Sequence, residues 1–264
     1  MDADTALCGE DSLQALVECY LQRRGFLSVQ PYHIVPRLQE KLSAYFNAIV
    51  MAGINAFTPL GRRLSPSGGF GPCAICSRKD YYDTAGHSGV RTAVMEDIAL
   101  SKRFQSRGLP VSGFGGRKVM TYRMYPGSFR EMIEGWSRSM ASGAGGTRVF
   151  IFALIVVWLS GSTASFALAF STRAFQGMPP YLVGPAIYLA YALQLHWMLR
   201  RIGSFGLATA LLYPVSLLFF YITFVRSLYL TVFRKRISWR GRSVDLASGR
   251  RKGGREDGGG GESR

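Results

Sequence analysis

The sequence predicts an α/β domain that is followed by a membrane region and a short basic tail. Residues 1–145 alternate between helical and extended apolar patterns, which favours a sheet covered by helices. Residues 149–170 contain no charged side chain, and at about 1.5 Å per helical residue such a run is long enough to cross a bilayer. We therefore divide the chain into a mixed domain (1–145), a membrane region with about three transmembrane helices (146–233) and a tail (234–264).

Within the mixed domain, helices are expected where apolar residues recur with the helical period, and strands where they alternate. In order, we expect a helix over residues 11–24, a strand over 26–30, a helix over 38–57, a strand over 70–76, a helix over 95–107 and a strand over 118–122. The first helix places Leu13, Leu16 and Val17 on one face and is followed by Gly25, a common residue after a helix end. Residues 44–57 are apolar enough to lie against a membrane surface.

Two further apolar runs, over residues 181–199 and 205–225, follow the first. Three spans that start from a cytosolic domain place the C-terminus outside, whereas the positive-inside rule keeps a basic tail in the cytosol. We expect one apolar segment, either 44–57 or part of 205–233, to be re-entrant or interfacial, so that the tail is cytosolic. The tail begins with basic residues that suit anionic lipid head groups, and it should be disordered after about residue 244, where apolar periodicity is absent.

The charge of the chain raises the question of nucleic-acid binding. There are 32 Lys+Arg and 16 Asp+Glu, a net charge of +16, and such a charge is common in proteins that bind nucleic acid. However, 48% of the residues are hydrophobic, and residues 1–145 lack a module in which aromatic and basic residues are interleaved. We therefore expect a membrane protein with no nucleic-acid partner.

Two acidic pairs are candidates for catalysis. Asp2 and Asp4 are one residue apart, and on a strand end this spacing lets both face one hard cation, although a solvated acidic terminus has the same pattern. Glu96 and Asp97 open a predicted helix, where acidic residues also complement the helix dipole. Transfer of a sugar from a nucleotide diphosphate needs a cation that neutralises the leaving group and a base that deprotonates the acceptor. The first pair suits the cation, and the second suits the base.

These pairs belong to a longer set of short motifs in a fixed order. The set consists of MDADT (1–5), LSVQPYH (27–33), GFGPC (69–73), Gly86-His87, Glu96-Asp97, RMYP (123–126), EGW (134–136) and SWRGR (238–242). It resembles the membrane-bound family-2 glycosyltransferases, and most nearly the bacterial carotenoid-acid (diaponeurosporenoate) glucosyltransferases. The resemblance covers about residues 1–242.

The resemblance implies the C-terminal part of a GT-A-type glycosyltransferase domain, and an inverting hexosyltransferase that uses a nucleotide sugar, with UDP-glucose as the implied donor. Asp2 and Asp4 match the residues that hold Mg²⁺ or Mn²⁺ with the diphosphate, and Asp97, with its neighbour Glu96, matches the catalytic base. The implied acceptor is a membrane lipid such as a carotenoid acid. The implied location is the cell membrane, with several spans and the catalytic domain facing the cytoplasm.

Three further residues are candidates for contact with the acceptor or with phosphate, namely His87, Arg123 and Trp136. Trp136 matches the tryptophan of the Q-x-x-R-W motif of processive relatives, but this chain has MIEGW over residues 132–136 and so lacks the glutamine and the arginine. This departure favours one transfer per acceptor over polysaccharide synthesis. A lone histidine is more often structural, and Arg123 suits a solvated or membrane-surface role equally well.

The D-x-D motif stands at residue 2, whereas in this family a long segment with the uridine site, and usually a first transmembrane helix, precedes the motif. We therefore expect an N-terminal truncation, either from an internal start codon or from loss of part of the gene. Two alternatives stay open. One is an inactive membrane fragment of such an enzyme, and the other is a synthase that acts on another lipid or on a polyisoprenoid acceptor.

Overall fold

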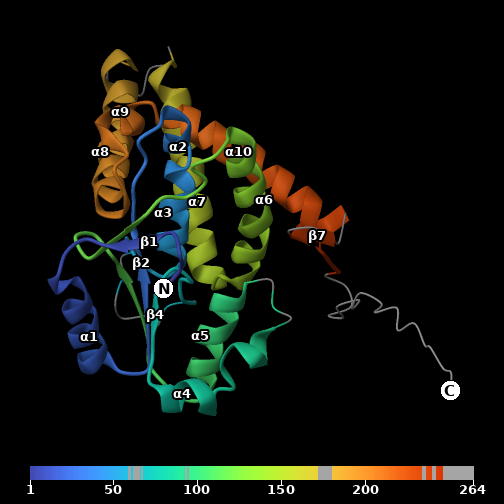
Figure 1. Cartoon of the computed structure of the whole chain (residues 1–264). Helices are drawn as coiled ribbons and strands as arrows, with labels where there is room; N and C mark the ends of the chain where they lie inside the picture. Colours follow the sequence, from blue (N-terminus) through green and yellow to red (C-terminus); the bar gives the residue numbers. More distant parts are fainter. Residues whose placement is uncertain are drawn as a thin grey trace, which may run out of the picture.

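The computed structural model describes residues 1–58, 61, 66, 68–91, 93, 95–171, 180–233, 236–239 and 242–245. In Figure 1 the strands before residue 123, together with the helices of residues 11–23, 78–83 and 96–106, form the lower part of the molecule. Most of the helices after residue 129 form the upper part. The mixed domain and the apolar helices expected from the sequence are thus both present.

Two small sheets form the centre of the mixed domain. One has the order β1 (Thr5–Leu7), β6 (Met120–Tyr122), β3 (Tyr32–His33), and the other has the order β4 (Ala74–Ile75), β2 (Phe26–Gln30), β5 (Val111–Gly115). Each sheet contains one parallel and one antiparallel pair, and β2 runs parallel to β5 with Phe26 opposite Val111. Residues 26–29 of β2 are all buried, as expected for a strand with both faces covered.

Helices α1 (Asp11–Arg23) and α5 (Glu96–Ser106) pack on the two faces of β2. Leu16 of α1 lies in one buried cluster with Leu27, whereas Phe104 of α5 lies against Phe26 with ring centroids 5.0 Å apart. Because successive strand side chains point to opposite faces, neighbouring residues of β2 anchor different helices. This packing holds α5, whose first two residues are the second acidic pair, against the sheet. Between β4 and α5 the chain forms α4 (Arg78–Asp83) and a 3-10 turn, η2 (Gly86–Val90).

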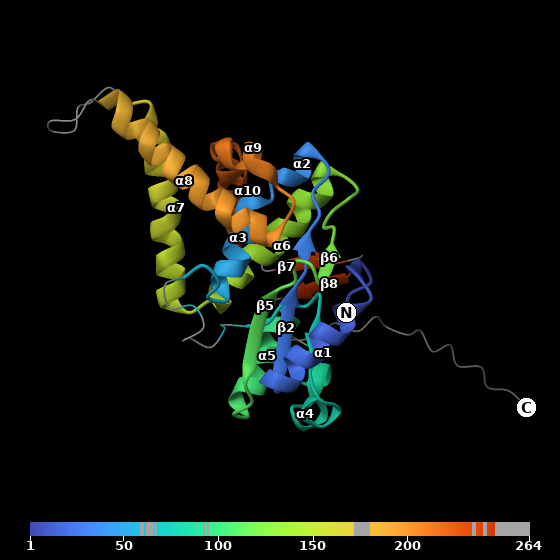
Figure 2. The same cartoon turned by 90° about the vertical axis from the view of Figure 1, so that its left-hand side faces the viewer.

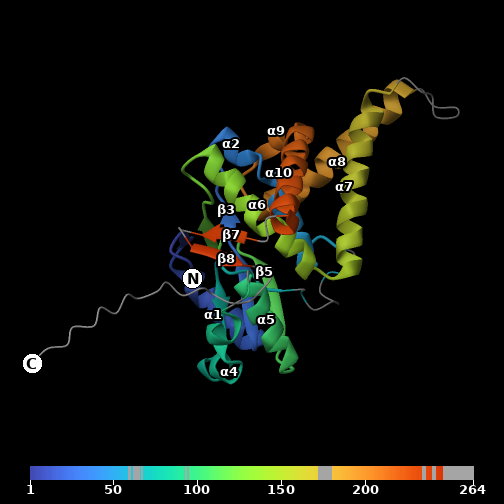
Figure 3. The same cartoon turned by 90° about the vertical axis from the view of Figure 1, so that its right-hand side faces the viewer.

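The upper part is built from helices of very different lengths. They are α2 (Leu38–Lys41), α3 (Ala44–Gly53), α6 (Phe129–Gly146), α7 (Val149–Ala169), α8 (Pro180–Ile202), α9 (Gly206–Leu211) and α10 (Tyr213–Phe233). Among the described residues, three segments are long and apolar enough to cross a membrane, namely Val149–Ala169, Leu182–Ile202 and Tyr213–Thr231. α7 packs against α8, and α10 packs against α6 (Figures 2 and 3).

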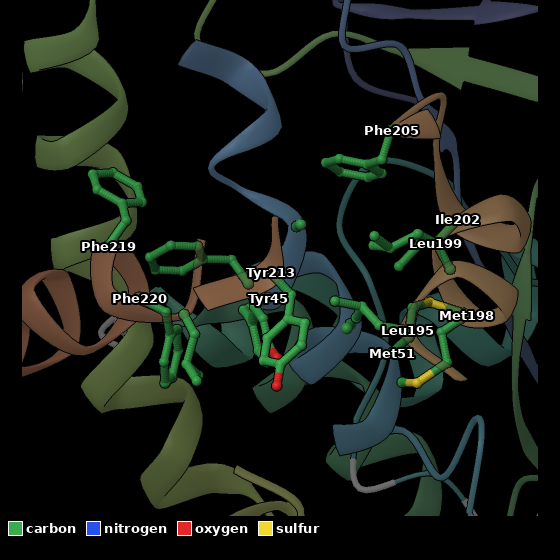
Figure 4. Packing of buried hydrophobic residues seen from close by; sticks show 14 of the residues in the cluster. Tyr45, Met51, Leu195, Met198, Leu199, Ile202, Phe205, Tyr213, Phe219 and Phe220 are labelled. Carbon is green, nitrogen blue, oxygen red and sulfur yellow. The ribbon is translucent and has the colours of Figure 1, made fainter. Parts of the chain in front are cut away.

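α3 lies at the centre of this helical part. Its residues Tyr45 and Phe46 are fully buried. Figure 4 shows Tyr45 beside Tyr213 of α10, with Phe220 on one side and Leu195 of α8 on the other. The apolar segment expected over residues 44–57 is therefore largely a core helix of the protein, because the surrounding helices cover it.

Several predicted boundaries differ from the structure. The helix expected over 38–57 is divided into α2 and α3, and the strand expected over 70–76 shortens to β4, since Pro72 has no N–H for a strand ladder. In the tail, which was expected to be disordered after about residue 244, β7 (Arg236–Trp239) and β8 (Arg242–Asp245) pair as an antiparallel hairpin. Ile237, Trp239 and Val244 are residues that favour strands. Residues 246–264 lie outside the described residues.

Candidate functional site

A cavity of about 450 Å³ lies where the mixed domain meets the long helices. Its walls come from α3, α6, α7 and α10, from residues 68–72 and from the start of α5. Most of the lining side chains are apolar. The polar lining residues are Gln30, Asp97, Tyr122, Trp136, Thr147, Ser160 and Tyr221, and Asp97 is the charged residue among them. A mostly apolar cavity of this size with a few polar groups is typical of a ligand site.

Asp97 is the second residue of α5 and lies against the loop at Gly71. A Cβ atom at position 71 would overlap the Asp97 carboxylate, so this close approach requires glycine. Burial, together with the neighbouring Glu96 and Asp2 carboxylates, raises the pKa of Asp97 to about 6, against a smaller opposite effect of His87. A carboxylate whose pKa lies near the working pH is suited to general base catalysis.

Asp2 and Asp4 are exposed and are not among the residues that line this cavity. The Asp2 amide donates a hydrogen bond to the carbonyl oxygen of Pro72, 2.9 Å away, beside the loop that contacts Asp97. The Asp2 carboxylate contributes to the raised pKa of Asp97. Burial raises the pKa of Tyr122, and the Asp4 carboxylate adds to that effect. The two residues lie directly before the first residue of β1.

A metal ion beside Asp97 would need oxygen ligands such as carboxylates. Within the described part of the chain, no group of three or more His, Cys, Asp or Glu side chains could hold one. Mg²⁺, however, is usually bound by one or two carboxylates together with substrate phosphates and water. The exposed Asp2 and Asp4 fit an ion that arrives with a diphosphate, and such a cation would relieve the repulsion between Asp2 and Asp97.

His87 has an electrostatic effect on Asp97, whereas Arg123 is paired with another residue. His87 lies in η2, is exposed, and its Nδ1 is 2.8 Å from the hydroxyl oxygen of Tyr81. His87 lowers the pKa of Asp97, an effect that is smaller than those of burial and of the neighbouring carboxylates. Arg123 does not line the cavity and forms an ion pair of 2.6 Å with the buried Glu40 of α2. In this structure Arg123 therefore compensates a buried charge.

Trp136 of α6 is 4% exposed and lines the cavity together with Asp97. Its ring stacks on Phe46 of α3 with centroids 4.7 Å apart and 24° between the planes, and Tyr125 meets it edge-on. Among the described residues its Nε1–H has no hydrogen-bond partner. One face of the indole is thus used for packing, so that Trp136 shapes the wall of the cavity.

The cavity wall also contains a polar pair that was not predicted from the sequence. Gln30 Nε2 donates a hydrogen bond to the Tyr122 hydroxyl, 2.6 Å away, and both residues line the cavity. They end β2 and β6, and polar residues at strand ends were the available signal. A third residue of the same region, His33, is buried between the rings of Tyr122 and Phe205. Burial lowers its pKa to about 4, so it is neutral at pH 7 and packs as an aromatic residue.

Comparison with known proteins finds relatives along almost the whole chain. The 4,4'-diaponeurosporenoate glycosyltransferase of Staphylococcus aureus (strain MRSA252) is 35% identical over 250 residues, which are 94% of this chain and 66% of that protein. The proteins of strains USA300 and NCTC 8325 match to the same extent. The chain thus spans 66% of the length of these curated relatives. No family model matches the chain. No solved structure matches it either. Along nearly its whole length, the chain is a homologue of the 4,4'-diaponeurosporenoate glycosyltransferases.

Proposed function

We propose that the protein transfers a hexose from a nucleotide sugar, with UDP-glucose as the expected donor, to a membrane lipid acceptor such as a carotenoid acid. The observation that carries this proposal is the cavity, where a carboxylate at the start of α5 meets a long apolar space between helices. An acceptor with an apolar chain and an oxygen head group matches this arrangement. The names of the relatives, which are glycosyltransferases for diaponeurosporenoate, support the same reaction class.

In this proposal the mixed domain is the C-terminal part of a GT-A-type domain of family 2, and it faces the cytoplasm at the cell membrane. Asp2 and Asp4 hold Mg²⁺ or Mn²⁺. The ion supplies charge neutralisation for the departing diphosphate. The acceptor reaches the sugar from the side of Asp97 and attacks the anomeric carbon opposite the leaving group, which inverts the configuration there.

Asp97 has two different tasks, depending on the acceptor. With an alcohol, it accepts the hydroxyl proton as the new C–O bond forms. With a carboxylic acid, whose reference pKa is about 4, the nucleophile is already ionised at neutral pH. Asp97 then orients the acceptor, or holds a proton itself in its partly desolvated position. His87, which has an electrostatic effect on this carboxylate, contacts the acceptor or a phosphate oxygen in this proposal.

Membranes that contain the full-length gene product test this function. They are incubated with radiolabelled UDP-glucose, a divalent cation and a carotenoid acid, and the lipid phase is then extracted. We expect labelled glycolipid in the presence of Mg²⁺ or Mn²⁺, and loss of this product after chelation and in the Asp4→Ala variant. Product that forms equally well after chelation, or label that appears only as free glucose, would contradict the proposal.

A further inference from the structure

The cavity extends along α7, as its lining residues on that helix show. They are Phe152, Ile155, Val156, Leu159 and Ser160. Their spacing places them on one face of the helix, and at about 1.5 Å per residue they cover about 12 Å of its length. α7 begins next to the mixed domain, since a Cβ atom on Gly146 would lie 3.7 Å from Ile98, the residue after Asp97. The cavity therefore runs from Asp97 along α7, away from the mixed domain.

The far end of the cavity is closed by Tyr221 of α10. The Tyr221 side chain lines the cavity, and its hydroxyl lies 2.9 Å from the hydroxyl of Thr163 on α7. The same hydroxyl donates to the Leu159 carbonyl oxygen at 3.3 Å. Thr163 stands one turn beyond Ser160, and among the described residues of α7 Ser160 is the last that lines the cavity. The contact between α7 and α10 thus coincides with the end of the cavity.

The side of the cavity along α7 is accessible from the lipid. Phe152 and Val156 line the cavity, yet they are 40% and 44% exposed. Both lie in a segment that is long and apolar enough to cross a membrane, and the exposed face of such a segment contacts lipid. Figure 3 shows α7 to the side of α10. An apolar molecule dissolved in the bilayer can reach the cavity here without passing through water.

We infer that the apolar chain of the acceptor enters from the bilayer along α7 and that Tyr221 limits how far this chain can extend from Asp97. This inference rests on the proposed function and assigns a chain-length selecting role to a residue outside the mixed domain. The occupant is a single linear chain with an acid or alcohol head group. Such a head group can share a proton with Asp97. The phosphate of a bilayer phospholipid carries a permanent negative charge, which Asp97 and Asp2 would repel.

Photolabelling of the 264-residue chain in lipid nanodiscs tests this inference. The probes are linear fatty acids of graded length that carry a diazirine at the terminal carbon, and mass spectrometry identifies the labelled residues. We expect label on α7 and α10 around Ser160 and Tyr221, with a maximum at one chain length. In Tyr221→Ala this maximum should move to longer acids, since each additional buried methylene strengthens binding about fourfold.

Two variants control for effects on folding and on the helix surface. Tyr221→Phe keeps the ring and removes the hydroxyl, so the preferred length should stay closer to that of the unchanged chain than in Tyr221→Ala. Ile222→Ala changes a neighbouring residue that is 61% exposed and does not line the cavity, and it should leave the preferred length unchanged. The same shift in Tyr221→Ala and Ile222→Ala would overturn the inference, as would label confined to outward residues such as Val157.

The inference and the proposed function can fail separately. If the full-length gene product transfers hexose with the same acceptor-length dependence in the unchanged protein and in Tyr221→Ala, the role of Tyr221 is refuted and the reaction stands. If the photolabel shows the Tyr221-dependent length preference but no hexose is transferred to any acid or alcohol, the reaction is refuted. The cavity is then a site for apolar acids with another purpose.

Discussion

Asp97 combines partial burial with a position near two other carboxylates, and both features bear on its chemistry. In the full-length gene product, we expect Asp97→Asn to lower the rate with an alcohol acceptor by about 10²–10⁴-fold, the usual contribution of a positioned base. With a carboxylic acid the loss should be smaller, because that acceptor has no proton to give at neutral pH. Initial rates with a matched pair of acid and alcohol acceptors measure the difference.

The control for this comparison is Asp83→Asn, which neutralises an exposed carboxylate at the end of α4 and should leave both rates unchanged. Equal and severe losses with both acceptors in Asp97→Asn would show that the residue acts through geometry. An undiminished rate with the alcohol would remove Asp97 from the catalytic assignment.

The raised pKa of Asp97 also predicts a pH dependence. Below its pKa of about 6 the carboxyl group is protonated and cannot act as a base. With an alcohol acceptor, kcat/KM should therefore fall about tenfold for each further pH unit below this value. In Glu96→Gln one neighbouring negative charge is removed, so the pKa of Asp97 falls and the acid limb moves to lower pH. A pH–rate profile that moves to higher pH in this variant would contradict the electrostatic explanation.

Substitution of Gly71 tests whether the position of the Asp97 carboxylate matters for activity. A methyl group at residue 71 would overlap the Asp97 side chain, so Gly71→Ala should displace it. A displacement of about 1 Å can lower a rate about 10²-fold, and we expect a loss of this order. Gly9→Ala is the matched control, since a Cβ atom there meets no heavy atom within 4 Å. Unchanged activity of a folded Gly71→Ala protein would show that the close approach is dispensable.

At the scale of elements, the contact between α5 and β2 holds the acidic pair against the cavity. Phe104 of α5 is fully buried, and its ring lies 5.0 Å from that of Phe26. We expect Phe104→Ala to reduce the free energy of unfolding by about 3–5 kcal/mol, the usual cost of removing a buried phenyl ring. Leu38→Ala, at a residue that is 81% exposed, should change it by less than about 0.5 kcal/mol. Thermal and denaturant unfolding in detergent measure both, and similar losses would show that this contact is not tightly packed.

At the scale of the whole molecule, the side of the membrane on which the tail lies is the main prediction. The positive-inside rule places the basic tail in the cytosol, which is also the side of the mixed domain in the proposed function. Cys8 of the mixed domain is exposed and serves as an internal reference. A cysteine introduced at Gly259, outside the described residues, should react with a membrane-impermeant maleimide from the same side of sealed vesicles as Cys8.

Labelling of the two cysteines from opposite sides would show that an odd number of helices crosses the membrane and that the tail lies outside. α3 is buried among other helices. It is therefore not expected to be the re-entrant or interfacial segment. The last apolar run is interrupted at Leu212, between α9 and α10. We therefore expect α10 to be the interfacial helix if Cys8 and the tail share one side.

Elements that have a local signal could be predicted from the amino-acid sequence alone. The helix of α1, the buried strand β2, the acidic start of α5 and the apolar helices follow from patterns over a few neighbouring residues. The order of the short motifs indicated a likeness to diaponeurosporenoate glycosyltransferases, which the relatives confirm. Asp97 could also be predicted as a candidate catalytic base, because an acidic pair at the start of a helix is recognisable in the sequence.

Which of these residues contact one another depends on the tertiary fold. The cavity, the Gln30–Tyr122 pair and the closure by Tyr221 each join residues from distant parts of the chain. Arg123 has the same sequence signal as a phosphate ligand. In the structure, however, it forms an ion pair with the buried Glu40, which is 83 positions away. Periodicity reports which face of an element is apolar. Periodicity does not identify the partner of that face, because burial and ion pairing depend on side chains that the fold brings together from distant parts of the chain.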